Sequence, residues 1–274
     1  MNQAIPTYRV RLFGRAVAHA FSTRHGGVSS GTFASLNLSA RVGDLPELVV
    51  ENRRRLLESL GLRLEDTVAL LQVHGNRVVE ATEGDRGRGV VESAQLPAEA
   101  DAMITRESGL GLLIVAADCV PVLFWDPVKG AIGAAHAGWR GTVRGVVART
   151  LVAMAETFGT KAGDVLVGVG PAIGPCCYEV DEPVLSALEQ AFPDHCSRVV
   201  APARPGHGML DLQEANRLQL LDAGVPESQI EVLGLCTACH RDQFYSERAE
   251  GRPSGRFGAV IALSGSRRRS YEGV

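Results

Sequence analysis

Residues 116–141 read A-A-D-C-V-P-V-L-F-W-D-P-V-K-G-A-I-G-A-A-H-A-G-W-R-G. Two apolar segments in this stretch, 122–125 and 131–135, are separated by the turn-forming letters D-P-V-K-G. Short apolar runs bounded by Asp, Pro and Gly are typical of paired strands joined by a tight turn. An unbroken apolar run at 112–116 comes directly before them and predicts a further buried strand. The sequence therefore predicts a β-hairpin beside a buried strand at the centre of the fold.

The register of this hairpin decides whether its two chemically interesting residues meet. If Phe124 pairs with Ala131, the same register places Cys119 opposite His136. Directly opposed residues on one sheet face lie about 5 Å apart at Cβ, close enough to share a metal ion. A slip of one residue would put the two side chains on opposite faces. We therefore predict that Cys119 and His136 share a face.

Strand and helix patterns continue through the whole chain, and neither an internal repeat nor a clear linker interrupts them. A chain of 274 residues is long enough to bury a large core, so we expect a single domain over residues 1–274. The segment 77–81 is expected to pair back on 67–73 through a turn at His74. Further strands are expected at 8–13, 16–22, 101–105, 164–170, 230–235 and 258–263, and helices at 46–60, 143–158, 183–192 and 212–223.

Composition excludes several classes of protein. The net charge of −3 and the pI of about 6.2 argue against a nucleic-acid partner, and the arginine run at 267–269 is expected to be a solvated tail. No run of about 18 apolar residues predicts a membrane span, and the first ten residues lack the apolar core of a secretory signal. Six cysteines in such a chain indicate reduced thiols. We expect a cytoplasmic protein without a membrane partner.

Three candidate metal ligands, His74, Cys119 and His136, each stand at the end of an expected strand. Two imidazoles and one thiolate suit zinc with a fourth position open for water. An open zinc site lowers the pKa of its water towards about 7, and zinc deaminases use such chemistry at the amino-bearing carbon of a base. The same ligands also suit a copper electron-transfer site. A full multicopper centre needs many more imidazoles, whereas the chain has seven histidines.

A metal-free interpretation uses two of the same residues. Cys119 beside His136 has the residue types of a nucleophile and its base, with Asp118 or another group available to orient the imidazole. This arrangement would make the protein a cysteine hydrolase or amidase. A non-catalytic binding protein is the third alternative, and the open ligand set argues against it.

Two glycine-rich stretches are candidate contacts for an anionic ligand. The loop at 21–38 carries Arg24 and Asn37 together with several glycines whose amides would be free to face an anion. Arg140 lies in the sequence G-W-R-G just before an expected helix, where free N–H groups favour phosphate. A C-T-A-C-H sequence at 236–240 is a further candidate metal site. Four ligands are needed for structural zinc, and no second CxxC exists, so unligated thiols are expected there.

Several motifs together resemble one known family over nearly the full chain. They are F-S-T-R-H-G-G-V-S at 21–29, S-L-N-L at 35–38, Q-V-H-G at 72–75, A-D-C-V-P at 117–121, A-H-A-G-W-R-G at 135–141, C-Y-E-V at 177–180 and the C-terminal F-Y-S-E-R and G-R-F sequences. This set is similar to the laccase-domain, YfiH-type family, long described as multicopper polyphenol oxidases and now regarded as purine nucleoside phosphorylases.

The resemblance implies an α+β fold in which mixed sheets pack together with helices outside, related to toxin deamidase domains. It implies zinc held by His74, Cys119 and His136, with copper as the alternative metal. The implied reactions are phosphorolysis of adenosine, inosine and methylthioadenosine, and deamination of adenosine. An amidase acting on peptidoglycan precursors and a copper-dependent polyphenol oxidase remain alternatives. We expect a monomer or weak homodimer.

The resemblance has one visible departure near the C-terminal end. The family usually has Arg where this chain has Glu247. Arg248 is therefore the better candidate for a phosphate contact, beside Arg24, Asn37 and Arg140 as the other candidate substrate contacts.

Overall fold

The computed structural model describes residues 5–90 and 98–264, so the arginine run at 267–269 lies outside the described residues. Its strands form three sheets. The five-stranded sheet has the order β1 (Thr7–Tyr8), β2 (Val17–Ser22), β14 (Phe257–Leu263), β6 (Gly111–Ala116) and β3 (Thr67–Ala69). The six-stranded sheet has the order β13 (Ile230–Val232), β9 (Leu166–Val169), β7 (Val120–Asp126), β8 (Ala131–Ala137), β5 (Ala102–Thr105) and β4 (Val78–Glu80). The three-stranded sheet has the order β10 (Glu179–Asp181), β12 (His207–Leu210) and β11 (Val200–Pro202).

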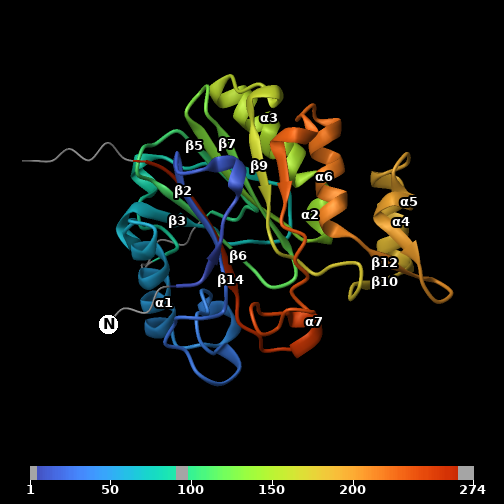
Figure 1. The fold of residues 1–274 in the computed structure, drawn as a ribbon, viewed down its shortest axis with the longest axis horizontal. Coiled ribbons are helices and arrows are strands. Elements are labelled where there is room, and N and C mark those ends of the chain that lie inside the picture. The colour runs from blue at the N-terminus through green and yellow to red at the C-terminus, as the bar shows by residue number, and fades with distance from the viewer. Residues whose placement is uncertain (1–4, 91–97, 265–274) are drawn as a thin grey trace, which may run out of the picture.

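The two larger sheets pack face to face, and helices cover their outer faces (Figure 1). Alternate residues of the central strands fill the layer between the sheets, such as Ile114 and Ile261 from one and Leu123 and Ile132 from the other. This arrangement is the predicted α+β architecture of packed mixed sheets with helices outside. The helices are α1 (Pro46–Ser59), α2 (Trp139–Val143), α3 (Val146–Phe158), α4 (Glu182–Ala191), α5 (Cys196–Val199), α6 (Leu212–Asp222) and α7 (Glu247–Glu250).

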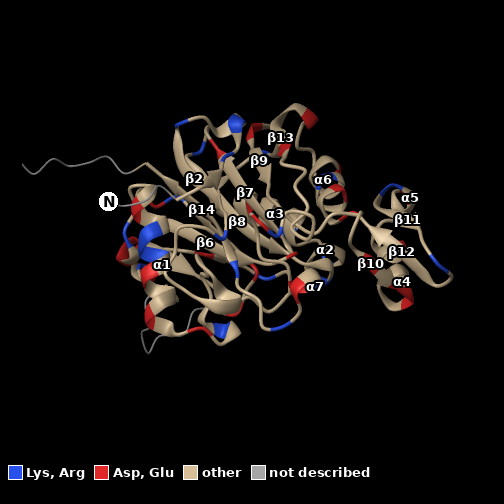
Figure 2. Cartoon of the chain, turned by 60° about the horizontal axis from the view of Figure 1, so that its bottom comes forward, with Lys and Arg blue, Asp and Glu red and all other residues tan. Residues whose placement is uncertain are grey.

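Each outer layer has its own hydrophobic core. Leu56 and Leu57 of α1 pack with Leu113 and Val260 on the outer face of the five-stranded sheet. The helices α3 and α6 cover the other side, where Leu151 packs with residues of β7 and β8. The exposed surface of α1 carries charges of both signs (Figure 2). Arg54 and Arg55 on this surface form ion pairs with Glu51. No helix among the described residues is long and apolar enough to cross a bilayer.

The small third sheet lies with α4 and α5 at one end of the molecule, beside the two larger sheets (Figure 1). Val184 and Leu188 of α4 join the same core as Leu210 of β12. The strand β10 follows directly after the irregular segment 171–178. This segment therefore connects the large sheet to the small one, and it passes the candidate site described below.

The predicted hairpin forms, but its register differs from the prediction by two residues. Phe124 pairs with Gly133, and Asp126 pairs with Ala131. The turn is shorter than expected because the Asp126 carboxylate accepts hydrogen bonds from the N–H groups of Val128 and Lys129. A shift of two residues preserves the sheet face, so the predicted side of the sheet is unchanged.

The predicted pairing of 77–81 on 67–73 is wrong. The strand β3 ends at Ala69 and pairs with β6, whereas β4 lies in the other sheet, parallel to β5. After β3 ends, the Gln72 side chain hydrogen-bonds the backbone of β6 in place of a strand backbone. Its amide donates to the C=O of Val115 and accepts from the N–H of Val115. The chain then crosses between the two sheets, and His74 lies at this crossing.

Two further segments differ from their expected form. Of the expected strand at 8–13, only Tyr8 belongs to a strand, β1 (Thr7–Tyr8), and Arg11–Phe13 forms a 3-10 turn that buries Phe13. The expected helix at 143–158 is divided into α2 and α3 by Gly145, whose φ of 74° is left-handed.

Candidate metal centre and active-site cavity

The three candidate metal ligands converge at one place. The ligating atoms of His74, Cys119 and His136 lie within 4.8 Å of one another. The two imidazole rings meet edge to face, with centroids 4.8 Å apart. Cys119 comes just before β7, His136 lies near the end of β8, and His74 comes from the crossing after β3. The hairpin thus supplies two ligands, and the sheet-to-sheet crossing supplies the third.

A buried carboxylate, Asp101, holds two of these ligands in place. Its Oδ1 lies 2.9 Å from Nδ1 of His136 and also accepts the N–H of His74 at 2.9 Å. Its Oδ2 accepts the N–H of Gly75 at 2.6 Å. When Nδ1 of His136 donates to this carboxylate, the lone pair of Nε2 is left for a ligand, as in carboxylate–histidine–metal sites. Asp101 therefore sets both the tautomer of one imidazole and the backbone position of the other.

Two residues at the site have unusual backbone conformations. His74 and Asp118 have φ values of 59° and 77°, respectively, in the left-handed region. Such conformations cost about 1–3 kcal/mol each and persist where surrounding contacts over-determine them. Asp118 is held by Thr237 Oγ1, which donates to its Oδ1 at 2.6 Å, and by the N–H of Arg248, which donates to its Oδ2 at 2.8 Å. These contacts tie the residue before Cys119 to the C-terminal segment.

The Cys119 thiol and the His136 imidazole perturb each other strongly. Burial raises the pKa of Cys119, but the charge of His136 and hydrogen bonds from both imidazoles outweigh burial and lower the pKa to about 6. Burial lowers the pKa of His136, whereas the Cys119 thiolate and Asp101 raise it to about 9. Cys119 is thus a thiolate at neutral pH, which is the form that binds metals and attacks electrophiles.

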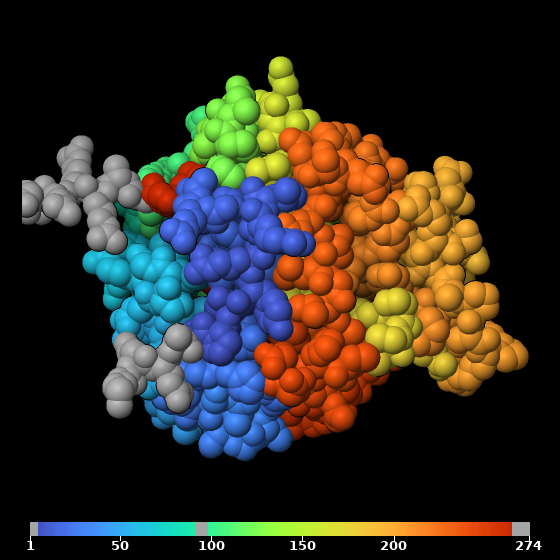
Figure 3. All heavy atoms as spheres, in the orientation of Figure 1, coloured from blue at the N-terminus to red at the C-terminus, as the bar shows by residue number. Residues whose placement is uncertain are grey.

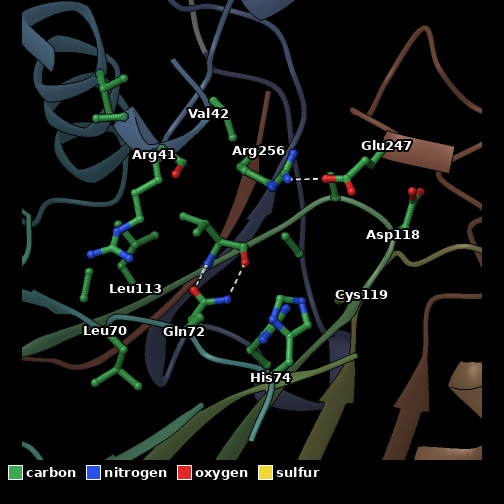
Figure 4. Close-up of a pocket in the computed structure, with 18 of the residues that line it drawn as sticks. Arg41, Val42, Leu70, Gln72, His74, Leu113, Asp118, Cys119, Glu247 and Arg256 are labelled. Carbon is green, nitrogen blue, oxygen red and sulfur yellow. Dashed lines mark hydrogen bonds and ion pairs between the residues drawn. The ribbon is translucent and has the colours of Figure 1, made fainter. Parts of the chain in front are cut away.

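The ligand cluster lies in the wall of a cavity of about 770 Å³. His74 and Cys119 lie on one side of the view in Figure 4, with Leu70 and Leu113 on the other. Apart from the imidazoles, the titratable side chains that line the cavity are predominantly basic, since six arginines outnumber the carboxylates of Asp118 and Glu247. The arginines are Arg41, Arg53, Arg140, Arg248, Arg252 and Arg256.

The arginines differ in how far the protein already uses their charge. Arg256 pairs with Glu247 (Figure 4), which also binds Arg252. The guanidinium of Arg140 stacks on Trp139, with 4.3 Å from Cζ to the ring centroid, and has no carboxylate partner within the described part of the chain. Arg248 lies over the Tyr178 ring and donates to the carbonyl of Glu179 at 2.8 Å. Arg140 therefore has more free donors for an anion than Arg256 has.

The structure places two of the seven predicted site residues outside the cavity. Arg24 donates to Glu250 at 2.6 Å and stacks on Tyr245. Its guanidinium therefore links the glycine-rich loop to the C-terminal segment that contains α7. Asn37 is fully buried, and its amide bonds Asp44 and the backbone of Ser39. In the glycine-rich loop, Gly27 N–H donates to Ser35 rather than facing a ligand. His74, Cys119, His136, Arg140 and Arg248 all line the cavity.

Sequence reasoning missed several residues of the site. The sequence predicts Asp101 only as the start of a strand. A carboxylate directly before a buried apolar run could have indicated a buried side chain with a specific partner. Trp139 and Tyr178 were not selected, and both line the cavity with an arginine stacked on the ring. Arg41 also lines the cavity and had no recognisable pattern around it.

The donor set fits a zinc ion. One thiolate and two imidazoles are zinc ligands in proteins, and a catalytic zinc keeps a fourth position open. The carboxylate of Asp101 behind His136 is the outer partner that such sites require. A catalytic zinc needs no fourth protein ligand. The cavity provides space beside the three ligands for a substrate or a water molecule.

Comparison with known proteins places these features in a family. Residues 18–264 match the model described as multi-copper polyphenol oxidoreductase laccase. The chain is 44% identical over 249 residues to the purine nucleoside phosphorylase YlmD of Geobacillus stearothermophilus, covering 91% of this chain and 90% of that protein. It is 39% identical to a purine nucleoside phosphorylase of Bacteroides thetaiotaomicron, covering 90% and 92%, respectively.

A solved structure agrees with the sequence relatives. The crystal structure of YlmD from Geobacillus stearothermophilus superposes with a TM-score of 0.91 at 41% identity, covering 96% of this chain and 98% of the other. The match of the family model over most of the chain, together with these relatives, shows that the chain belongs to the multi-copper polyphenol oxidoreductase laccase family.

Proposed function

We propose that this protein is a zinc-dependent purine nucleoside phosphorylase that also deaminates adenosine. In phosphorolysis, inorganic phosphate displaces the purine at the anomeric carbon, and the products are the free base and ribose 1-phosphate. Adenosine, inosine and methylthioadenosine are the proposed substrates. In deamination, water replaces the amino group of adenosine, which releases ammonia and inosine. The names of the relatives support the first reaction. The observation that supports both reactions is the cluster of three metal-ligand candidates in the wall of an arginine-rich cavity.

The cavity has two regions that fit the two parts of the reaction. Free or partly free guanidinium groups, those of Arg140, Arg248 and Arg41, are suited to hold a phosphate dianion. Trp139 and Tyr178 offer aromatic faces for a purine or ribose near the ligand cluster. Arg24 and Asn37 have no place in this proposal, because the protein itself uses their polar groups.

The ligands His74, Cys119 and His136 would hold the zinc. When bound there, zinc would supply a Lewis acid that acidifies water beside the substrate. Asp101 keeps the His136 imidazole in one tautomer and orientation. The arginines position the phosphate and stabilise the negative charge that develops in the transition state. All six cysteines are free of disulfides in the structure, and a thiolate ligand requires a reduced thiol. We therefore propose the cytoplasm as the location.

A cysteine hydrolase is the second candidate function, and one observation favours it. Cys119, His136 and Asp101 have the order of a nucleophile, a base and an orienting carboxylate. Asp118, the one orienting candidate named from the sequence, does not take this role, because its carboxylate is bound to Thr237 and Arg248. An amidase acting on peptidoglycan precursors would use this metal-free arrangement.

Copper-dependent phenol oxidation has weaker support. Within residues 5–90 and 98–264, the other cluster that could hold a metal contains four cysteines and no histidine. A multicopper cluster rich in imidazole is therefore not among the described residues, although a single copper would fit the same three ligands.

The test is chromatographic separation of the products formed from adenosine and phosphate by the purified, zinc-loaded protein. We expect adenine with ribose 1-phosphate from phosphorolysis, inosine from deamination, and hypoxanthine where the inosine is then phosphorolysed. Omitting phosphate should stop adenine formation and leave deamination unchanged, which separates the two reactions. Oxygen uptake with copper and a phenol, and release of a free amine from the amide bonds of peptidoglycan precursors, test the alternatives in parallel. Unchanged adenosine in the presence of zinc and phosphate would overturn the proposal.

A further inference from the structure

A second ligand cluster lies outside the active-site cavity. Cys176, Cys177, Cys236 and Cys239 have their four sulfur atoms within 4.8 Å of one another, and none of them lines the cavity. All four are free thiols. The sequence analysis considered only the C-T-A-C pair, because the chain has no second CxxC. The other two cysteines are adjacent and come from a segment about 60 residues earlier.

The sulfur spacing fits one tetrahedral metal ion. Cys239 Sγ lies 3.4 Å from Cys176 Sγ and 3.5 Å from Cys177 Sγ. Four thiolates around zinc, with bonds of about 2.3 Å, have their sulfurs about 3.8 Å apart at the tetrahedral angle. The observed separations are close to this value and far above the 2.05 Å or so of a disulfide bond. Thiolate sets of this kind select zinc over calcium or magnesium.

The backbone supports the same interpretation. The N–H of Gly174 donates to Cys236 Sγ at 3.2 Å. A backbone donor directed at a ligand sulfur is an outer contact expected of a metal site. A Cβ at Gly174 would lie 3.2 Å from Cys236 Cβ and 3.4 Å from Cys176 Sγ. The two segments thus approach so closely that a Cβ at this position would require Cys236 to shift slightly.

We propose that these four cysteines bind one zinc ion in a closed, structural site. With four protein ligands the ion keeps no open position, so it serves folding rather than catalysis. In the space-filling view, the yellow segment that carries Cys176 lies against the orange segment that follows β13 (Figure 3). The ion would join two segments that otherwise meet at an isolated bridge between Ala172 and Cys236.

The joined segments are those that shape the wall of the active-site cavity. Tyr178 follows the first cysteine pair directly and lies under Arg248. Thr237 lies inside the second pair and donates to Asp118 at 2.6 Å. Ile173 N–H donates to the carbonyl of the same Asp118 at 2.9 Å. The proposed zinc therefore holds the wall that supports the residue before Cys119.

The test counts zinc in a background from which the active-site metal has been removed. Cys119→Ser takes the thiolate from the active-site cluster, so any tightly held zinc should belong to the four-cysteine site. We expect one zinc per chain in Cys119→Ser, none in Cys119→Ser/Cys239→Ser, and one in Cys119→Ser/Cys196→Ser. Cys196 is the matched control because it belongs to neither cluster. Metal content is measured by mass spectrometry of the purified chain.

Cobalt gives a second readout that does not depend on a new variant of the four cysteines. Co²⁺ bound to Cys119→Ser should give intense sulfur-to-cobalt charge-transfer absorption and the visible bands of a tetrahedral site. The exposed thiols of Cys176 and Cys239 should resist alkylation until a chelator is added. Absence of zinc from Cys119→Ser, with rapid alkylation of these thiols, would overturn the proposal. So would a chain two hydrogens lighter than expected, since that mass shows a disulfide within the cluster.

Discussion

The molecule has two sulfur-containing clusters that differ in almost every property relevant to metal chemistry. The first, His74, Cys119 and His136, has three ligands of mixed type and lies in a cavity wall lined by arginines. The second, the four cysteines, has ligands of one type and lies outside that cavity. Open, mixed sites perform catalysis, whereas closed thiolate sites hold protein segments together. Ligand number and access, rather than ligand identity alone, separate the two roles.

The clusters also differ in how the chain builds them. Strands and a buried carboxylate position the first, so its geometry depends on the two packed sheets. Two irregular segments position the second, with a short bridge and a few hydrogen bonds between them. Segments with so little pairing of their own gain most from a metal clip. Loss of the first cluster should therefore act directly on activity, whereas loss of the second should act first on stability and reach activity only through the cavity wall that it supports.

The largest expected effect is that of His136→Ala on phosphorolysis. We expect kcat/KM to fall at least about 1000-fold, because the variant removes a metal ligand and the partner of the Cys119 thiolate. Deamination should be lost with it, since both reactions are assigned to one metal. The control is His207→Ala on β12, in the small outer sheet. A variant whose rate in either reaction stays within tenfold of wild type would contradict a shared site.

Asp101→Asn should weaken the first cluster without emptying it. We expect the zinc affinity of this cluster to fall about 10- to 100-fold, as for other outer partners of ligating histidines. Competition with a coloured chelator measures the affinity in the Cys236→Ser/Cys239→Ser background, so that the second cluster does not contribute. Asp126→Asn is the matched control, because Asp126 is also a buried carboxylate that binds backbone N–H groups but lies at the hairpin turn. Equal affinities for the two variants would show that Asp101 does not support the metal.

Arg140→Ala should separate the phosphate reaction from deamination at the same site. We expect the KM for phosphate to rise about tenfold or more, since a hydrogen bond to a charged group contributes about 1.5–3 kcal/mol. Adenosine deamination, which uses no phosphate, should keep its rate. Arg198→Ala, on the surface pair with Glu214, is the control. An unchanged KM for phosphate would assign phosphate binding to other arginines.

Two glycine variants compare the clusters directly and should have the smallest effects. A Cβ at Gly138 would lie 2.8 Å from Cys119 Sγ and 3.1 Å from His74 Cδ2. Gly138→Ala should therefore lower kcat several-fold, with little change in melting temperature. Gly174→Ala should lower the melting temperature with little change in kcat, because its Cβ would crowd Cys236 rather than Cys119. Activity assays and thermal unfolding of both variants test this comparison. An equal loss of activity in the two variants would contradict the assignment of catalysis to the first cluster and of stability to the second.

Much of the first cluster could be predicted from the sequence because strand geometry is local. Side chains alternate between sheet faces with a period of two, so the prediction that Cys119 and His136 share a face survived an error of two residues in register. The helix α1 was likewise predicted from its apolar stripe. The hairpin error arose at the turn, where one carboxylate, Asp126, binds two backbone N–H groups and shortens the loop.

The sequence by itself indicated most strands of the two larger sheets, the longer helices, the family motifs and the three candidate ligands, because each depends on neighbouring residues or on a recognisable pattern. It did not predict the strands of the small sheet, β10, β11 and β12. Only the tertiary structure placed Asp101 behind His136, moved β4 into the second sheet and brought Cys176 and Cys177 to Cys236 and Cys239. It also showed that Arg24 and Asn37 are bound within the protein. These contacts join residues far apart in the chain, and no local periodicity records which distant segments pack against each other.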